Sequence, residues 1–260
     1  IDRNQGWGVA NEGHRALEVL SRLGQDCWMS LGDRDLGLHI WRTMRRRRGD
    51  RPSQIAADAA QAFGVRPKLV LPTDDIVKTM VRTNSGWLSF QEYFVREKCA
   101  PDVLELRFDG LDQARATREA LDAIGDADII VFAPSNPLVS IGPILGIAQI
   151  RESLRSTAAP KIAVSPFIAG KVVKGPADRM MASLGRRADA LGVSELYCDL
   201  IGHMVIDRQD ADLAPQIESL GLSASLHDIL MRDQADKARL ADEVVAIAEA
   251  ALATHAKTSQ

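Results

Sequence analysis

The chain has 260 residues, of which 46% are hydrophobic, 26% charged and 5% aromatic. Such a chain can bury a sizeable core, which excludes a disordered, collagen-like or low-complexity protein. Its formal net charge of −3 is too close to neutral for the basic surface that broad nucleic-acid binding requires.

The cysteines and the hydropathy of the chain indicate its cellular location. Cys27, Cys99 and Cys198 lie far apart, with no C-x-x-C pair, which argues against a disulfide framework or a zinc site. No apolar run approaches the roughly 20 residues of a membrane span, and no signal peptide opens the chain. We therefore expect a cytoplasmic protein that does not enter a membrane. Because the first residue is Ile1 rather than Met, we expect the chain to begin partway into a longer protein.

The first hundred residues are predicted to be helical and then to form a hairpin. Apolar residues at helical spacing, followed by glycine, indicate three helices. The turn Asn84-Ser85-Gly86 between two β-rich runs indicates a β-hairpin. The predicted helices cover about residues 11–23, 35–48 and 52–63, and the predicted strands 76–83, 87–96 and 103–108.

The rest of the chain alternates strands and helices. Short buried-type strands are predicted at residues 128–132 and 161–164. Buried strands separated by helices indicate a parallel sheet that is covered on both faces. The predicted helices cover residues 111–124, 141–154, 176–190 and 235–254.

The first loop that could carry chemistry, residues 133–142, leaves the carboxyl end of a predicted strand. It offers the hydroxyls of Ser135 and Ser140, the amide of Asn136 and free backbone N–H groups at the next helix start. Ligands of open α/β sheets bind at this edge, and helix starts attract anions. The alternative is that Ser and Asn only cap the helix while Pro137 shapes the turn.

The second loop, residues 165–178, leaves the next predicted strand. Gly170 and Gly175 permit close backbone approach to a ligand, and Lys171 and Lys174 could neutralise phosphates. The alternative is a surface loop with solvated lysines. The Walker A and G-x-G-x-x-G patterns are absent, but two such loops on neighbouring strands favour a phosphate or nucleotide site.

A third segment places Asp33 and Asp35 at the start of a predicted helix. If the helix begins near Asp35, then His39 and Arg42 follow at i+4 and i+7, so one face presents an acid, an imidazole and a guanidinium. The acids could contact a metal, a hydroxyl or a neighbouring Arg. The alternative is N-capping by one Asp with an ion pair to Arg34.

Several segments combine into one pattern. They are Asp2-Arg3, Gly6-Trp7-Gly8, Leu31-Gly32-Asp33-Arg34-Asp35-Leu36, His39, Arg42-Thr43, Phe90-Gln91-Glu92, Ala133-Pro134-Ser135-Asn136-Pro137, Ser140-Ile141-Gly142, Ser165-Pro166, Gly170-Lys171 and Lys174-Gly175-Pro176-Ala177-Asp178. In this order and spacing they resemble the 2-phospho-L-lactate transferase family along nearly the whole chain.

The resemblance implies a Rossmann-like, three-layer α/β/α fold with a mostly parallel sheet and a helical N-terminal portion. It implies one transferase domain, with a helical and hairpin insertion over about residues 10–100 and an α/β core over about 101–260. It also implies a magnesium-dependent homodimer of coenzyme F420 biosynthesis. Such an enzyme moves a phospho-lactyl or phospho-enolpyruvyl group from a guanosine diphosphate conjugate to the ribityl hydroxyl of the deazaflavin Fo, and GMP leaves.

On this resemblance Asp33, Arg34 and Asp35 are candidate catalytic residues. The candidate substrate-binding residues are His39, Arg42, Gln91, Glu92, Ser135, Asn136, Pro137, Ser140, Ser165, Gly170, Lys171, Lys174, Gly175 and Asp178. Family members normally begin with a strand, a Gly-rich loop and an Asp-rich segment, none of which this sequence contains. We therefore expect part of the sheet and the magnesium ligands upstream of Ile1.

Two other functions stay open at this point. Regulatory proteins of the gluconeogenesis-factor type share the core and bind nucleotide sugars without known catalysis, but the Gly-Asp-Arg-Asp-Leu segment favours a transferase. A dinucleotide dehydrogenase would need the glycine fingerprint that is missing. The sequence does not distinguish lactate, enolpyruvate and glycerate as the acid that is carried.

Overall fold

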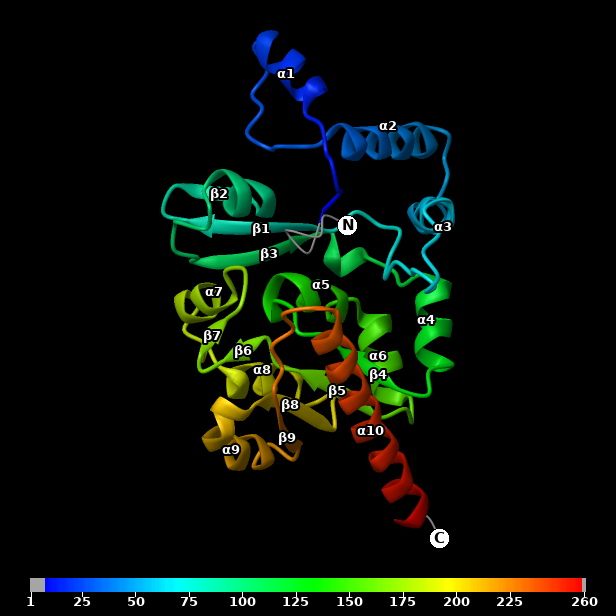
Figure 1. Ribbon diagram of the computed structural model, residues 1–260, viewed down its shortest axis with the longest axis vertical. Coiled ribbons are helices and arrows are strands. Elements are labelled where there is room, and N and C mark those ends of the chain that lie inside the picture. The colour runs from blue at the N-terminus through cyan, green and yellow to red at the C-terminus, as the bar shows by residue number, and fades with distance from the viewer. Residues whose placement is uncertain (1–7, 259–260) are drawn as a thin grey trace.

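The computed structural model describes residues 8–258, with side chains described as far as residue 253. Figure 1 shows the N-terminal helices at one end of the molecule, a small antiparallel sheet beside them, and a second sheet with its helices at the other end. Within the described residues no helix is both long enough and apolar enough to cross a membrane.

The central element is a four-stranded parallel sheet in the order β4-β5-β8-β9. Its strands are β4 (Ile130–Phe132), β5 (Lys161–Val164), β8 (His203–Asp207) and β9 (Ser223–His227). The predicted α/β fold with a parallel sheet is therefore confirmed. Strands β8 and β9 were not predicted, because the apolar run of β8 is only three residues long and serines interrupt the apolar pattern of β9.

Helices cover both faces of this sheet, which gives three layers (Figure 1). Ala163 and Met204 pack with one helical layer, and Val164 and Val205 on the opposite face pack with a single long helix, α10 (Gln234–Thr258). This alternation follows from the two-residue period of a strand. The first layer consists of α4 (Arg118–Gly125), α6 (Ala148–Ser156), α8 (Ala190–Tyr197) and α9 (Ala214–Glu218), and η4 (Arg208–Leu213) follows β8.

A separate antiparallel sheet has the order β2-β1-β3. The predicted hairpin is confirmed: Thr83 pairs with Gly86, whose φ of 111° suits the turn. The strands are β1 (Lys78–Thr83), β2 (Gly86–Ser89) and β3 (Glu105–Asp109). Because β3 pairs with β1, this sheet extends past residue 100, where the sequence suggested the boundary of the insertion.

The predicted strand over residues 87–96 is wrong after Ser89, because the chain turns into a π-helix, η1 (Glu92–Arg96). The Glu92 carboxylate accepts the Ser89 N–H at 2.8 Å, and the Glu92 N–H donates to the Ser89 hydroxyl at 3.3 Å. This reciprocal pair is a capping box.

Two of the predicted helices contain a capping residue that starts a new, shorter helix. Thr117 accepts the Ala120 N–H at 3.1 Å and starts α4, and Asp189 accepts the Gly192 N–H at 2.8 Å and starts α8. Such side chains compete with a continuing helix. The additional segments are η2 (Leu111–Gln113), η3 (Pro137–Ile141), α5 (Gly142–Leu145), β6 (Phe167–Ile168), β7 (Lys171–Val172) and α7 (Ala177–Ser183).

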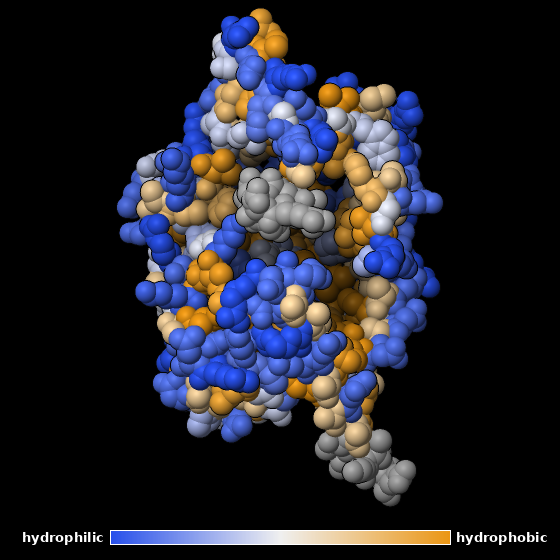
Figure 2. Space-filling model, in the orientation of Figure 1, coloured by the Kyte–Doolittle hydropathy of each residue, from blue (hydrophilic) through white to orange (hydrophobic). Residues whose placement is uncertain are grey.

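The N-terminal portion has the three predicted helices, α1 (Arg15–Arg22), α2 (Asp33–Arg47) and α3 (Pro52–Ala62). No residue of α1 or α2 is buried. Leu23 is 70% exposed and Phe63 is 73% exposed, and Figure 2 shows orange hydrophobic patches at this end of the molecule. Of the three helices only α3 has buried residues, among them Ile55 and Ala60.

Candidate active site

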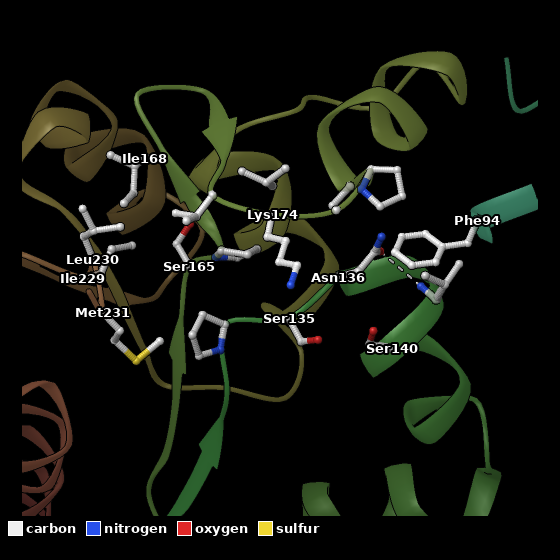
Figure 3. A pocket seen from close by; sticks show the side chains of 18 of the residues that line it. Phe94, Ser135, Asn136, Ser140, Ser165, Ile168, Lys174, Ile229, Leu230 and Met231 are labelled. Atoms are coloured by element: carbon white, nitrogen blue, oxygen red, sulfur yellow. Dashed lines mark hydrogen bonds between the residues drawn. The ribbon is translucent and has the colours of Figure 1, made fainter. Parts of the chain in front are cut away.

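One pocket of about 420 Å³ lies at the carboxyl edge of the parallel sheet. The loop after β4 contributes Ser135, Asn136 and Ser140, and the loop after β5 contributes Ser165 and Lys174. The predicted convergence of the two loops is therefore what the structure shows (Figure 3). Of the predicted site residues the pocket is lined by Ser135, Asn136, Ser140, Ser165, Lys174 and Gly175.

Asn136 caps η3 with its side chain. Its Oδ1 accepts the N–H groups of Leu138 at 2.9 Å and Val139 at 3.2 Å, and its Nδ2 lies 3.7 Å from the Met180 sulfur. The expectation of free N–H groups at this helix start is thus wrong for Leu138 and Val139. For Asn136 the capping alternative is correct, and the side chain holds the loop that carries Ser135.

Ser165 is fully buried, and its hydroxyl accepts the Phe167 N–H at 3.0 Å. It shapes the turn that leaves β5. Figure 3 shows the Lys174 amino group directed toward Ser135 and Asn136. Lys174, Ser135 and Ser140 together place one cation and two hydroxyls on the same side of the pocket, which suits an anionic phosphate group.

The other walls of the pocket are apolar. Phe90 and Phe94 stack with ring centroids 5.6 Å apart and an interplanar angle of 16°. Opposite them lie Ile168 and residues 229–231. Phe90 belongs to the pattern that carries the family resemblance, but neither phenylalanine was predicted as a site residue, because a strand was expected there. The i, i+4 spacing of Phe90 and Phe94 on a helical turn is the signal that could have identified them.

Asp33 lies outside the pocket lining and caps α1. Its carboxylate accepts the N–H groups of Arg15 at 3.2 Å and Ala16 at 3.0 Å. Arg34 donates to the Ala10 carbonyl at 2.8 Å rather than to Asp33. Capping by an Asp is therefore correct in kind, but the capped helix is α1 and not the helix that Asp33 begins.

We expect Asp33→Ala to destabilise α1 by about 1 kcal/mol, because the helix loses its cap and buries no side chain. Asp33→Asn should keep the cap only in part, since its single amide oxygen can accept one of the two N–H groups that the two carboxylate oxygens accept. Amide hydrogen exchange at Arg15 and Ala16 measures the difference. Equal exchange in both variants would show that Asp33 does not hold this helix.

Other predicted site residues also have structural contacts. Hydrogen bonds from the Ser89 hydroxyl and backbone hold the pKa of Glu92 below its usual range. Asp178 accepts the Arg179 N–H at 2.8 Å, and Lys171 is exposed. The predicted site residues outside the pocket lining are Asp33, Arg34, Asp35, His39, Arg42, Gln91, Glu92, Pro137, Gly170, Lys171 and Asp178. Asp2, Arg3, Gly6 and Trp7 lie outside the described residues.

The described residues do not fit a magnesium site. Among residues 8–258 no group of three or more His, Cys, Asp or Glu side chains could hold a metal ion. Glu12 has one buried oxygen with no hydrogen-bond partner, while its other oxygen accepts the N–H groups of Gly13 at 3.0 Å and Arg34 at 3.1 Å. One carboxylate oxygen does not make a magnesium site.

Comparisons with known proteins give the family. The family model described as 2-phospho-L-lactate transferase CofD matches residues 10–249. The 2-phospho-L-lactate transferase of Methanosarcina acetivorans is 35% identical over 247 residues, covering 95% of this chain and 80% of the relative. The phosphoenolpyruvate transferase of Streptomyces coelicolor is 33% identical over 255 residues, covering 96% and 80%.

Solved structures support the fold. A Bacillus halodurans protein of the UPF0052 family superposes with a TM-score of 0.57 and 14% identity, covering 88% of this chain and 78% of that chain. A second structure from Bacillus halodurans gives a TM-score of 0.60 and 13% identity, covering 83% and 72%. The fold, the family match and the curated relatives agree, and the chain belongs to the 2-phospho-L-lactate transferase family, an enzyme family of the transferase class.

Proposed function

We propose that this protein transfers a phospho-lactyl or phospho-enolpyruvyl group from a guanosine diphosphate conjugate to the ribityl hydroxyl of Fo in coenzyme F420 biosynthesis. The observation that carries the proposal is the pocket in which Lys174, Ser135 and Ser140 face an apolar, aromatic wall. Relatives named for phospholactate and for phosphoenolpyruvate match about equally well, so the proposal includes both acids.

The reaction is the attack of an alcohol on phosphorus. The acceptor hydroxyl oxygen forms a bond to the phosphorus that bears the three-carbon acid, and the bond from that phosphorus to the bridging oxygen breaks. GMP leaves with the electron pair, and the hydroxyl proton goes to solvent. The chain contributes positioning and charge neutralisation. Lys174, Ser135 and Ser140 donate hydrogen bonds to the phosphoryl oxygens, where negative charge is concentrated.

The stacked phenylalanines suit a planar fused ring, which both Fo and guanine possess. We expect Phe94→Ala to weaken binding of Fo or of GDP about tenfold, because ring stacking is worth roughly 1–3 kcal/mol. Isothermal titration with each ligand shows which ring is affected. Phe63→Ala is the matched control, since Phe63 is 73% exposed on the far helical portion. Unchanged affinity for both ligands would exclude the stacking role.

The direct test supplies Fo, the guanosine diphosphate conjugate and magnesium, and follows GMP by chromatography and modified Fo by mass spectrometry. We expect GMP and product in equal amounts. Binding of a UDP-sugar without binding of Fo would instead support the regulatory alternative. Magnesium dependence and a homodimer stay predictions from the family resemblance, and a cytoplasmic location stays a prediction from cysteine usage and hydropathy.

A further inference from the structure

Two buried carboxylates lie at the end of β8, behind the pocket. Asp207 and Asp210 are each only 4% exposed, and neither lines the pocket. Acidic side chains are almost never fully buried without partners, because removing them from water is costly. The hydrogen-bond partners of Asp207 and Asp210 therefore indicate what role these side chains have.

Asp207 holds the segment that follows β9. One of its oxygens accepts the backbone N–H of Gln209 at 3.0 Å and the side-chain amide of Gln209 at 3.2 Å. The other accepts the N–H of Ile229 at 3.3 Å. Ile229 begins the run 229–231, which lines the apolar side of the pocket.

Asp210 holds the hairpin formed by β6 and β7. Its carboxylate accepts the N–H of Ala169 at 3.1 Å. Ala169 has a φ of 49° and Gly170 a φ of 72°, so a residue with a side chain occupies the left-handed region in this turn. The hydrogen bond from Ala169 offsets this backbone strain. The hairpin places Ile168 in the same wall as Ile229.

Asp210 is buried close to other carboxylates, which disfavours its charged form. Burial, and then the neighbouring carboxylates of Asp207, Asp212 and Asp189, raise its pKa above the ordinary aspartate value. A buried acid held by backbone N–H groups is typical of a position that fixes geometry, and these two buried acids, three residues apart, support one wall.

We propose that Asp207 and Asp210 are positioning residues that hold the β6–β7 hairpin and residues 229–231 together, so that Ile168, Val172 and residues 229–231 form the apolar wall of the pocket. The end of β8 thereby fixes the distance between this wall and the polar side that carries Lys174. The consequence for substrate binding rests on the proposed function, whereas the two hydrogen-bonded anchors do not.

The test uses amide hydrogen exchange and substrate binding on the same variants. Asp210→Ala should speed exchange at Ala169 roughly tenfold, because the N–H loses a charged acceptor. It should also raise the KM for the guanosine diphosphate conjugate several-fold, with a smaller change in kcat. Asp210→Asn should restore both values, since its amide oxygen can accept the same N–H. Asp212→Ala, on the same turn but exposed, is the matched control and should change neither.

A second variant tests the other anchor even if Asp210→Ala does not fold. In Asp207→Asn the oxygen stays with the two Gln209 donors, so the side-chain amide faces the Ile229 N–H. Exchange should then rise at Ile229 and not at Ala169. If exchange is unchanged in both variants, Asp207 and Asp210 do not hold these N–H groups. If exchange is faster but KM is unchanged, they do not position the pocket wall for substrate binding. If the unmodified protein binds neither GDP nor Fo, the proposed function fails. The exchange data alone then show whether Asp207 and Asp210 hold the two segments.

Discussion

Replacing Lys174 with alanine is expected to lower kcat/KM for the transfer about a hundredfold, the magnitude typical of removing one donor to a transition-state oxyanion. Lys174 lines the pocket, and its amino group is directed toward Ser135 and Asn136 (Figure 3). Its positive charge is therefore placed where phosphoryl oxygens gain negative charge. Steady-state kinetics with the guanosine diphosphate conjugate measure the loss.

Lys171 provides the matched control. It lies in the same loop and is exposed, as Lys174 is, but it does not line the pocket. Lys171→Ala should change kcat/KM by no more than about threefold, as surface substitutions usually do. Equal losses in both variants would mean that the loop attracts anions by its overall charge. No loss in either would remove Lys174 from the proposed site.

Two substitutions of Asn136 distinguish the effect of losing the helix cap from the effect of adding a negative charge. Asn136→Ala removes the acceptor for the Leu138 and Val139 N–H groups, which should cost about 1 kcal/mol of folding stability and lower Tm by about 2–4 °C. Asn136→Asp keeps the cap but adds a negative charge to the polar side of the pocket. We expect Asn136→Asp to be as stable as the unmodified protein and to bind GDP at least about tenfold more weakly, because like charges repel.

Thermal unfolding and titration with GDP distinguish the two effects. An aspartate variant that binds GDP normally would place the diphosphate elsewhere. An alanine variant with unchanged Tm would show that the cap contributes nothing to stability. Because Asp and Asn are similar in size, a change in shape does not explain a difference between them.

The sequence predicts the fold where local pattern and burial agree. The apolar runs that become β4 and β5 mark strands, and the turn at Asn84-Ser85-Gly86 marks the hairpin. It fails where tertiary contacts override the pattern. The run 223–227 is Ser-Ala-Ser-Leu-His, yet it forms the edge strand β9 because β8 supplies a partner. The capping box at Ser89 similarly turns a strand-like segment into a helical one.

The candidate site could also be predicted only in part, because topology places some of its residues and tertiary contacts determine the others. Residues that follow strands are placed by topology, so Ser135 and Lys174 are found from the sequence. Which side chain faces a ligand depends on hydrogen bonds that no local pattern specifies. Asn136 and Asp33 carry suitable groups but use them on backbone N–H groups. The Phe94 ring is missed because a strand is expected where a helical turn forms. The buried acids behind the pocket depend on contacts between distant segments.

The contrast between the two ends of the molecule has a thermodynamic consequence. The heat-capacity change of unfolding follows the apolar area that becomes hydrated, and α1 and α2 contribute little to it because their apolar residues are half-buried or exposed. A calorimetric scan therefore records the melting of the sheets and their covering helices. The first two helices can unwind well below that transition without leaving a peak of their own.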